Sequence, residues 1–529
     1  MSNEVEFNSL QGKDEVKVKL EQPSRVPQKP SDEEVAKYSK TRMVLVVFFG
    51  LVILAMIVAA VVIIIVAPKC AKAKVRDMDK SWLENEVVYK ISAQQFNKNL
   101  TGIIDKLGYL ENLGVKVLSI GAVFSEEDLQ DVNNALGKME DFQNLLKKAH
   151  DRKMRVIVDF VPNHTSKKNK WFEESSVNKT NSKRNWYVWR DSANNWPSMN
   201  GGSAWEKDPK TNQYYLHQFS VDQPDLNYHE EAVVKAINGV VKFWSEKGVD
   251  GFSVSGIEYL LEDSDFRNDG YTEKFNASLP LTYDMTKHNS TYDLDGNLNI
   301  VKTFRDTLDE VDGSYRALVV QVSSTKNIAA LYNSSDLPVA ALANKIDLAD
   351  LPGSINKTVM AYLAMVPAGK WPTFTLGDSK IDDKMVDAMN VLLLTLPGTP
   401  LSTSGQELGL ESMKWDGEGV KEQEKGNKSH YSVYKAASAL RRNDAFKKVK
   451  TQDIHVDSQV YAYLRADKYL VVINFSDKEW NGDLPKISGH GVCRLDNKFE
   501  MVDKIVDPNT IKLQGGQVVV IEMKSVTLM

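Results

Sequence analysis

The sequence predicts an α/β fold, in which a single transmembrane helix is followed by a TIM (β/α)8 barrel with an inserted B domain and by a C-terminal antiparallel β-sandwich. Three observations predict it. One uninterrupted apolar run occupies residues 43–67. Short β-rich runs then alternate with amphipathic stretches over 85–445, and strand-like runs without helices between them fill 446–529. Long strand–helix alternation is typical of a parallel sheet, most often a TIM barrel at this size.

The N-terminal segment 1–42 precedes the apolar run. Its first 30 residues are polar and rich in charge, Gln, Pro and Ser, as in disordered tails. Ser31 and Glu34 have the spacing of a capping box, which predicts a short juxtamembrane helix. An ordinary solvated charge run is the alternative, and the sequence leaves both open.

The run 43–67 contains only apolar residues and Gly. As a helix, its 25 residues rise roughly 37 Å, enough to cross a hydrocarbon core of about 30 Å. A signal peptide fits poorly, because the run starts late, is long and has no clear cleavage site. We therefore expect a single-pass membrane protein.

Glycosylation sequons predict its orientation. Basic residues flank the apolar run on both sides, so the positive-inside rule does not decide. No Asn-x-Ser/Thr triplet precedes the run, whereas eight candidate sites follow it: Asn99, Asn178, Asn276, Asn289, Asn333, Asn356, Asn427 and Asn474. This asymmetry favours a type II protein with a cytosolic 1–42, an extracellular neck at 68–84 and an extracellular C-terminal bulk.

The predicted barrel elements follow in order. Buried strands are expected at 87–89, 115–120, 156–160, 251–254 and 318–322, and helices at 103–113 and 141–150. The aromatic- and Asn-rich stretch 165–225 has no clear period and predicts a B domain inserted after the third strand. In the terminal domain, 460–464, 469–475 and 517–523 predict strands of a sandwich.

Composition excludes several classes of protein. The 529 residues include 66 basic and 71 acidic ones, giving a net charge of −5, which argues against nucleic-acid binding. Two cysteines exclude a disulfide-knit scaffold and a multi-cysteine metal site. A mean hydropathy of −0.35 excludes a polytopic transporter.

Six motifs in order carry a family resemblance. They are DFVPNH at 159–164, NW at 195–196 with GGSAW at 201–205, YYLHQF at 214–219 with QPDLN at 223–227, GVDGF at 248–252, LPGTP at 396–400 and GQELG at 405–409. Together they resemble glycoside hydrolase family 13, the α-amylase family, in its oligo-1,6-glucosidase-like branch. The resemblance covers roughly 85–529.

The catalytic positions that this resemblance implies are degenerate. Such retaining enzymes use a nucleophilic carboxylate and an acid/base carboxylate about 5 Å apart. Where the family has Arg and the nucleophilic Asp, this chain has Ser253 and Ser255, and Gln321 stands at the acid/base glutamate. Only Asp378 matches a family acid. Ser255 has no base to activate it as a nucleophile, and the amide of Gln321 has no proton to give to a leaving group. The resemblance therefore implies no sugar turnover.

The remaining polar residues of the first motif receive a structural interpretation. Asp159, Asn163 and His164 are expected to brace strand ends by hydrogen bonds. The family's Asp- and Gly-rich calcium loop is missing at 96–102, and its Gly-Tyr-Asp contact is missing between Phe124 and Gly137. We expect no metal and no cofactor.

A silent amylase fold on a type II anchor resembles the heavy subunits of heteromeric amino acid transporters, solute carrier family 3. That family has Pro-Lys/Arg-Cys after its anchor, and Pro68-Lys69-Cys70 matches. The resemblance implies a disulfide from Cys70 to a polytopic light chain that carries the amino acid. The insert at 165–225 is rBAT-like, whereas the lost nucleophile and calcium loop are typical of the 4F2 heavy-chain-like branch.

The residues themselves leave a second pairing open. A thiol at the oxidising membrane edge tends to become cross-linked, but Cys493 offers an internal partner for Cys70. Cys493 is most simply interpreted as a small buried hydrophobe. Ala55 and Ala59 are spaced for close helix–helix contact in lipid, although any apolar helix contains some alanines.

The sequence therefore predicts a non-catalytic heavy chain that brings a light chain to the plasma membrane and stabilises it there. A membrane-anchored α-glucosidase and a stand-alone carbohydrate-binding or adhesion receptor are the alternatives. The transported amino acids and the light-chain partner cannot be read from the sequence.

Overall fold

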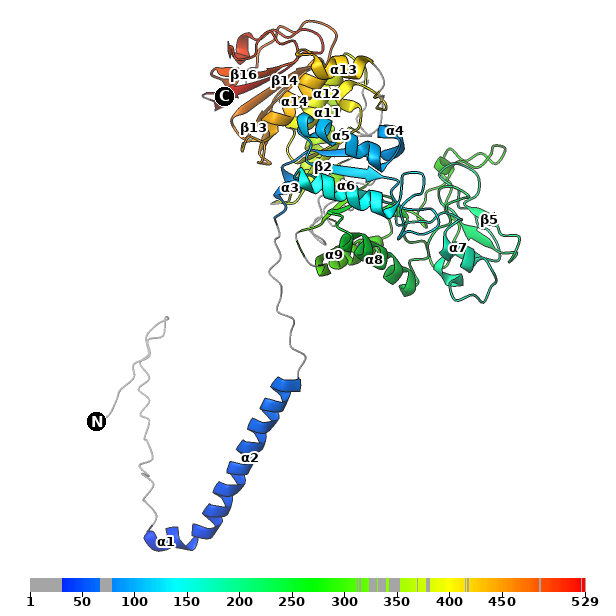
Figure 1. Cartoon of the computed structure of the whole chain (residues 1–529), viewed down its shortest axis with the longest axis vertical. Coiled ribbons are helices and arrows are strands. Elements are labelled where there is room, and N and C mark those ends of the chain that lie inside the picture. The colour runs from blue at the N-terminus through cyan, green and yellow to red at the C-terminus, as the bar shows by residue number, and fades with distance from the viewer. Residues whose placement is uncertain are drawn as a thin grey trace, which may run out of the picture. The chain divides into compact units, whose positions relative to one another are not determined.

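The computed structural model describes residues 31–66, 79–311, 313, 315–322, 331, 339–341, 353–368, 370–376, 381–413, 415, 418–484, 487–524 and 526–528 (Figure 1). The chain divides into two compact units, Met1–Val75 and Arg76–Met529, and each is described by itself.

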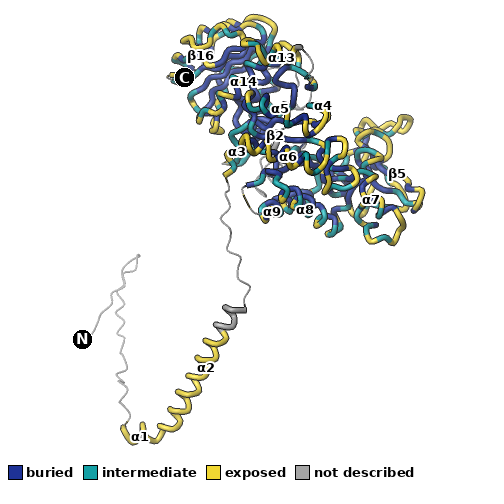
Figure 2. The backbone as a smooth tube through the Cα atoms, viewed as in Figure 1, coloured by how far each residue is buried: buried dark blue, intermediate teal, exposed yellow. Residues whose placement is uncertain are grey.

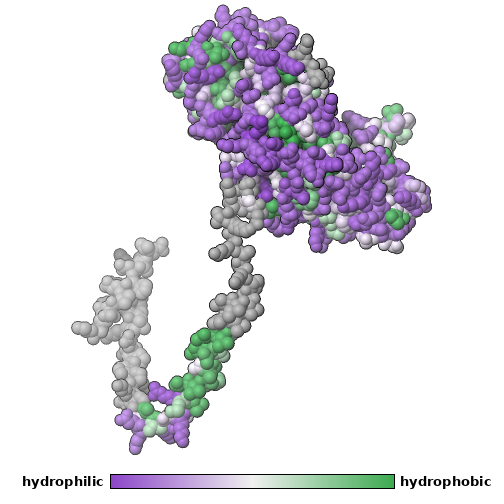
Figure 3. All heavy atoms as spheres, in the orientation of Figure 1, coloured by the Kyte–Doolittle hydropathy of each residue, from purple (hydrophilic) through white to green (hydrophobic). Residues whose placement is uncertain are grey.

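The described part of the first unit contains two helices. α1 spans Asp32–Lys37, and the carbonyl of Ser31 accepts a hydrogen bond from Val35 N at 3.0 Å. α2 spans Ser39–Val66, and its described side chains, up to Ala59, are all exposed (Figure 2). Over Ser39–Ala59 its mean hydropathy is 2.8, and Figure 3 shows it as a hydrophobic rod. This helix is long and apolar enough to cross a membrane.

α2 begins four residues before the apolar run. The backbone hydrogen bond from Arg42 N to the Tyr38 carbonyl is 2.8 Å long, so the polar residues 39–42 continue the same helical ladder. Helix formation depends on the backbone and not on apolar side chains, whereas a hydropathy pattern detects only the apolar part.

The second unit contains the predicted barrel. Eight strands of the described residues close it in the order β1-β11-β10-β9-β8-β7-β3-β2, with every pairing parallel. They are β1 Val88–Ser92, β2 Val117–Gly121, β3 Arg155–Phe160, β7 Gly251–Val254, β8 Ala317–Gln321, β9 Val339–Ala341, β10 Thr373–Thr375 and β11 Thr399–Thr403.

Helices cover the outside of the barrel. They are α4 Ala93–Asn97, α5 Leu100–Leu113, α6 Met139–Asp151, α8 Glu231–Glu246, α9 Asn297–Glu310, α11 Gly353–Met365, α12 Val386–Thr395, α13 Glu418–Lys425 and α14 His430–Arg441. α5 shows why such segments are helical: Asn99 caps it by accepting from Gly102 N at 2.9 Å, and Gly114 ends it at φ 94°. Its apolar positions face the largest apolar cluster of the unit.

The barrel interior changes from apolar to polar along its axis. Its amino end is filled by Val88, Val117, Ile157, Val319 and Leu401, which pack with Leu83 of α3 (Ser81–Glu84). One inward position further along each strand, the alternation brings polar side chains to the carboxyl end: Lys90, Ser119, Asp159, Ser253, Gln321 and Thr403. In TIM barrels this end carries the functional groups.

The predicted B domain is present between β3 and β7. It contains α7 Lys170–Ser175, the 3-10 turn η1 Arg184–Trp186 and a three-stranded sheet in the order β4-β6-β5, from Trp189–Arg190, Tyr214–Leu216 and Trp205–Lys207. A small apolar cluster that includes Trp196, Trp205 and Leu216 forms its interior.

A second excursion, from β7 to α9, was not predicted. It holds the 3-10 turns η2 Ile257–Tyr259 and η3 Tyr283–Met285 and lies against the B domain. The Trp196 indole donates to the Arg267 carbonyl at 2.9 Å, and Asn195 Nδ2 donates to the Asp269 carbonyl at 2.8 Å.

The terminal domain is antiparallel. Its six-stranded sheet has the order β12-β13-β14-β18-β16-β17, and β15 pairs with β19 in a second, two-stranded sheet. The strands are β12 Thr451–Val456, β13 Val460–Arg465, β14 Tyr469–Asn474, β15 Ile487–Ser488, β16 Gly491–Asp496, β17 Ile505–Val506, β18 Val518–Met523 and β19 Thr527–Leu528, and η7 spans Pro508–Thr510.

Both faces of the six-stranded sheet are covered. On one face, Tyr463 and Val471 share the large core with residues of α12 and α14. On the other, Val472 packs in a separate cluster with Trp480 and Ile487, the latter from β15. Cys493 belongs to this second cluster and is fully buried, which confirms its interpretation as a small hydrophobe.

Candidate functional site

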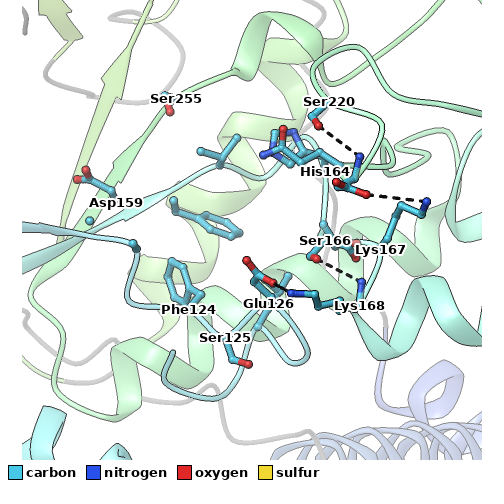
Figure 4. Close-up of a pocket in the computed structure, with 18 of the residues that line it drawn as sticks. Phe124, Ser125, Glu126, Asp159, His164, Ser166, Lys167, Lys168, Ser220 and Ser255 are labelled. Carbon is cyan, nitrogen blue, oxygen red and sulfur yellow. Dashed lines mark hydrogen bonds and ion pairs between the residues drawn. The ribbon is translucent and has the colours of Figure 1, made fainter. Parts of the chain in front are cut away.

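A cavity of about 830 Å³ opens at the carboxyl end of the barrel. Figure 4 shows Asp159 and Ser255 at one side of it and Lys167 and Lys168 at the other. Gln321 also lines it. The strands β3, β7 and β8 thus bring together the positions that the sequence singled out, as expected for a barrel mouth.

Hydrogen bonds occupy two of these side chains, those of Gln321 and Asp159. The Gln321 amide donates from Nε2 to Ser253 Oγ at 2.7 Å, across the neighbouring strands β7 and β8. Ser119 Oγ donates to Asp159 Oδ1 at 2.6 Å. The predicted strand-bracing hydrogen bond of Asp159 is therefore confirmed. Asp378 lies outside the described residues.

Asn163 and His164 differ from each other. Asn163 is buried and donates from Nδ2 to Asp225 Oδ1 at 3.1 Å, so its bracing role is confirmed. His164 braces through its backbone, which forms an isolated antiparallel β-bridge with Asp225. Its Nδ1 is buried without a partner in the described part of the chain, and its ring packs on Phe219 with centroids 5.1 Å apart. Burial lowers the pKa of His164 to about 4, so the ring is neutral at physiological pH.

Two buried carboxyl groups meet where the B domain joins the β7–α9 excursion. Gln218 N donates to Asp225 Oδ2 at 3.1 Å, and Gln218 Nε2 donates to Glu262 Oε1 at 3.2 Å. Burial raises the pKa of Asp225 to about 7. Burial and the charge of Asp225 raise the pKa of Glu262 well above its ordinary value. This junction therefore tolerates little negative charge.

Sequence reasoning missed a lysine in the cavity. Lys90 of β1 faces inward beside Ser119 of β2 and lines the cavity. Its signal was present in the strand Val88–Ser92, where a charge stands two residues after a buried valine and therefore on the same, inward face.

The mouth contains charges of both signs. Lys168 Nζ lies 2.7 Å from Glu126 Oε2, and Lys167 Nζ lies 3.9 Å from Asp222 Oδ1. Within the described ranges, no group of three or more His, Cys, Asp or Glu residues could hold a metal ion. What the arrangement provides is a polar, hydrogen-bonded cavity.

The predicted glycosylation sites fall into four sets, the last of which is the buried Asn474. Five Asn side chains are exposed: Asn99, Asn178, Asn276, Asn289 and Asn427. Asn356 is half-buried, and its Nδ2 donates to Asp453 Oδ2 at 2.7 Å. Asn333 and Cys70, the predicted interchain cysteine, lie outside the described residues.

Asn474 requires a correction. Its side chain is fully buried, and Nδ2 donates to the carbonyls of Lys478, Leu513 and Gln514. A glycan on this nitrogen would replace one of its two N–H donors and would have to enter the buried interior of the folded chain. The sequon pattern is wrong here, because it records neighbours in sequence and not burial.

Known proteins resemble both parts of the chain. The family model "Alpha amylase, catalytic domain" matches residues 87–350, and "Solute carrier family 3 member 2 N-terminus" matches residues 34–89. The amino acid transporter heavy chain SLC3A1 of Rattus norvegicus is 30% identical over 419 residues, which are 71% of this chain and 60% of the relative. The chain thus spans about three fifths of that heavy chain's length.

Glycosidases are similar as well. A probable alpha-glucosidase of Rhizobium meliloti (strain 1021) is 30% identical over 390 residues, 65% of this chain and 70% of the relative. The crystal structure of the alpha-glucosyl transfer enzyme XgtA superposes with a TM-score of 0.72 at 24% identity, covering 84% of this chain and 99% of that one. That structure supports the fold alone.

Proposed function

The chain belongs to the α-amylase family and is a relative of the solute carrier family 3 heavy chains, and on this premise we propose that it is the non-catalytic heavy chain of a heteromeric amino acid transporter. The observation that carries the proposal is the match of residues 34–89, which include α2, to the N-terminus of solute carrier family 3 member 2. In this role the chain is a type II protein of the plasma membrane.

The light chain is proposed to be polytopic and to bind in two ways. A disulfide from Cys70 would link the two chains, and α2, which from Met43 on is apolar on all sides, with Ala55 and Ala59 exposed, would contact the light chain within the membrane. The light chain carries the amino acid, and this chain brings it to the membrane and stabilises it there.

The proposed lack of glycosidase activity rests on the barrel mouth. Retaining hydrolysis needs a carboxylate nucleophile and a carboxylic acid. Gln321 has an amide instead, and this amide already donates to Ser253 at 2.7 Å. The Ser255 hydroxyl stands where the family places its nucleophile and has too high a pKa to attack without a base.

Non-reducing electrophoresis of the full chain, co-expressed with candidate light chains, tests the proposal. We expect a high-mass band that Cys70→Ser abolishes. Cys493→Ser is the matched control and should leave the band, since that thiol is buried. A band that persists in Cys70→Ser would refute the disulfide. If no polytopic protein co-purifies with the chain from native membranes, the heavy-chain role is refuted.

A second candidate function, α-glucosidase activity, is favoured by the similarity to a probable alpha-glucosidase and to maltase A1 of Drosophila melanogaster. Purified full-length chain should not hydrolyse maltose or a chromogenic α-glucoside. Turnover that survives Ser255→Ala would establish an enzyme whose catalytic groups lie elsewhere.

A further inference from the structure

The β7–α9 excursion presents an exposed aromatic pair. The rings of Tyr271 and Phe275 stack with centroids 3.7 Å apart and planes inclined by 23°, although 45% and 38% of these residues is exposed. Leu279, on the same turn, is 58% exposed. We call these three residues the tip patch.

Hydrogen bonds at its base hold the tip patch. Tyr271 and Thr286 form a β-bridge, and Thr272 N donates to the Met285 carbonyl at 3.0 Å. Lys274 Nζ lies 2.9 Å from Asp284 Oδ2. The apolar groups are therefore displayed on a closed, hydrogen-bonded loop, together with the exposed charged residues Glu273 and Lys274. Apolar groups gathered on such a surface mark a place where another molecule packs.

A sequon lies inside the tip patch. Asn276 directly follows Phe275 and begins the triplet Asn276-Ala277-Ser278. Its Oδ1 accepts a hydrogen bond from Ser278 N at 2.9 Å, and its carbonyl accepts one from Leu279 N at 3.1 Å. These bonds form an Asx turn at the end of the loop. Nδ2 has no hydrogen-bond partner within the described residues, so the atom that accepts a glycan is available.

The other exposed sequons lack this combination. Asn99 caps α5, and the hydroxyl-bearing residues that follow Asn289, Ser290 and Thr291, are both buried. Asn427 is exposed with Gly426 and Lys428 as neighbours and no aromatic residue beside it. Asn289 also follows a stacked pair, His288 on Tyr283, but both of those residues are half-buried. Asn276 alone among the five exposed sequon asparagines follows a stacked pair whose two residues are both exposed.

We propose that Asn276 carries an N-linked glycan whose first sugars lie over the stacked rings of Tyr271 and Phe275 and shield the tip patch from water. The apolar C–H face of a pyranose ring is complementary to an aromatic face. This inference rests on the proposed orientation, in which the barrel faces the secretory lumen.

The modification itself is a group transfer. A lipid-diphosphate-linked oligosaccharide is the donor. The bond from Asn276 Nδ2 to C1 of the first sugar forms as the C1–O bond to the diphosphate breaks. The lipid diphosphate leaves with the electron pair, and the amide loses one proton.

Substitutions at Ser278 test the proposal in the full chain expressed in eukaryotic membranes. Ser278→Ala destroys the sequon but keeps the backbone N–H that binds Asn276, and Ser278→Thr keeps the sequon. Mass spectrometry should find Asn276 modified in the wild type and in Ser278→Thr, and unmodified in Ser278→Ala. Ser278→Ala should also bind an apolar fluorescent dye at least about twofold more strongly than the wild type.

Two controls connect the dye signal to the aromatic rings. Adding Tyr271→Ser and Phe275→Ser to Ser278→Ala should return dye binding to the wild-type level. Asn427→Gln should remove a glycan without changing dye binding.

Each of three other outcomes would overturn a different part of the proposal. An unmodified Asn276 beside glycans at other sequons overturns the proposal and leaves the orientation standing. A chain without any glycan overturns the orientation as well. A modified Asn276 with equal dye binding in Ser278→Ala overturns the shielding.

Discussion

Removing a tyrosine hydroxyl at the seam where the barrel closes should destabilise the whole second unit. Glu407, in the 3-10 turn η6 (Gln406–Leu408) after β11, is fully buried. Its Oε1 accepts from the hydroxyls of Tyr89 on β1 and Tyr109 on α5, both at 2.8 Å, and its Oε2 accepts from Gly405 N at 3.0 Å. These contacts join segments that are 298 and 318 residues apart in the chain.

The magnitude follows from the number and kind of these bonds. A buried hydrogen bond to a charged group contributes about 1.5–3 kcal/mol. Tyr109→Phe removes one such bond and leaves Glu407 with two donors, so we expect a loss of about 2 kcal/mol. For a unit of this size that lowers Tm by roughly 2–4 °C. Tyr89→Phe should act similarly.

The double variant separates a network from two independent bonds. With both hydroxyls gone, Oε1 has no described donor, and burial already raises the pKa of Glu407. At pH 8 the second substitution should therefore cost more than the first, because a poorly solvated carboxylate remains. As the pH falls, the carboxyl can take up a proton, and this excess should shrink.

The assay is thermal unfolding of the full chain in detergent, followed by tryptophan fluorescence, since Trp415 packs edge-on against Tyr109 with centroids 4.9 Å apart. Tyr431→Phe is the matched control. That ring also contacts Tyr109, but its hydroxyl makes no hydrogen bond among the described residues. Equal Tm shifts in Tyr109→Phe and Tyr431→Phe would refute the assignment of the loss to Glu407.

Three further outcomes are expected. Burial raises the folded-state pKa of Asp225 to about 7. The stability that its protonated form contributes is therefore complete below about pH 4 and is lost as the pH rises through 7, a loss of about 4 kcal/mol. Asp225→Asn should flatten the dependence of Tm on pH between 5 and 8. Arg465→Met should lower the free energy of unfolding by about 3 kcal/mol in a chemical denaturation experiment. The reason is that the fully buried guanidinium donates to the carbonyls of Phe446, Lys448 and Lys450. A stability equal to that of the wild type would contradict this prediction. Asn474→Asp should lower Tm without changing glycan mass, whereas Asn427→Gln should reduce glycan mass without changing Tm; a mass loss in Asn474→Asp would show that the buried amide is modified.

The sequence predicted the elements better than the contacts between them. Hydrophobic runs located β3 and β7 within a residue or two, because buried parallel strands are apolar on both faces. The B domain was predicted because the stretch 165–225 has no clear hydrophobic period. The β7–α9 excursion was missed because its two 3-10 turns are three residues long each, too short to give a hydrophobic period, and its contacts to Trp196 and Asn195 cross 71 and 74 residues of sequence.

The candidate site shows the same limit. Motif order located Ser253, Ser255 and Gln321 at one barrel end; Ser253 and Gln321 lie on the adjacent strands β7 and β8, and Ser255 directly follows β7. That the Gln321 amide would donate to Ser253 was not predictable, since the pair becomes adjacent only through the register of β7 and β8. Lys90 could have been found from strand alternation alone, and Asn474 shows that a sequon carries no information on burial.

The burial of Cys493 has a practical consequence for chemical labelling. The chain has two cysteines, and burial raises the pKa of the Cys493 thiol to about 12, so this sulfur is both shielded and protonated in the folded state. A maleimide reagent should therefore leave it unmodified until the terminal sheet unfolds. Any fluorophore or spin label taken up by the native chain then reports on Cys70, and the stoichiometry of labelling measures the fraction of molecules in which that thiol is free. The natural sequence thus already provides a single-site labelling background.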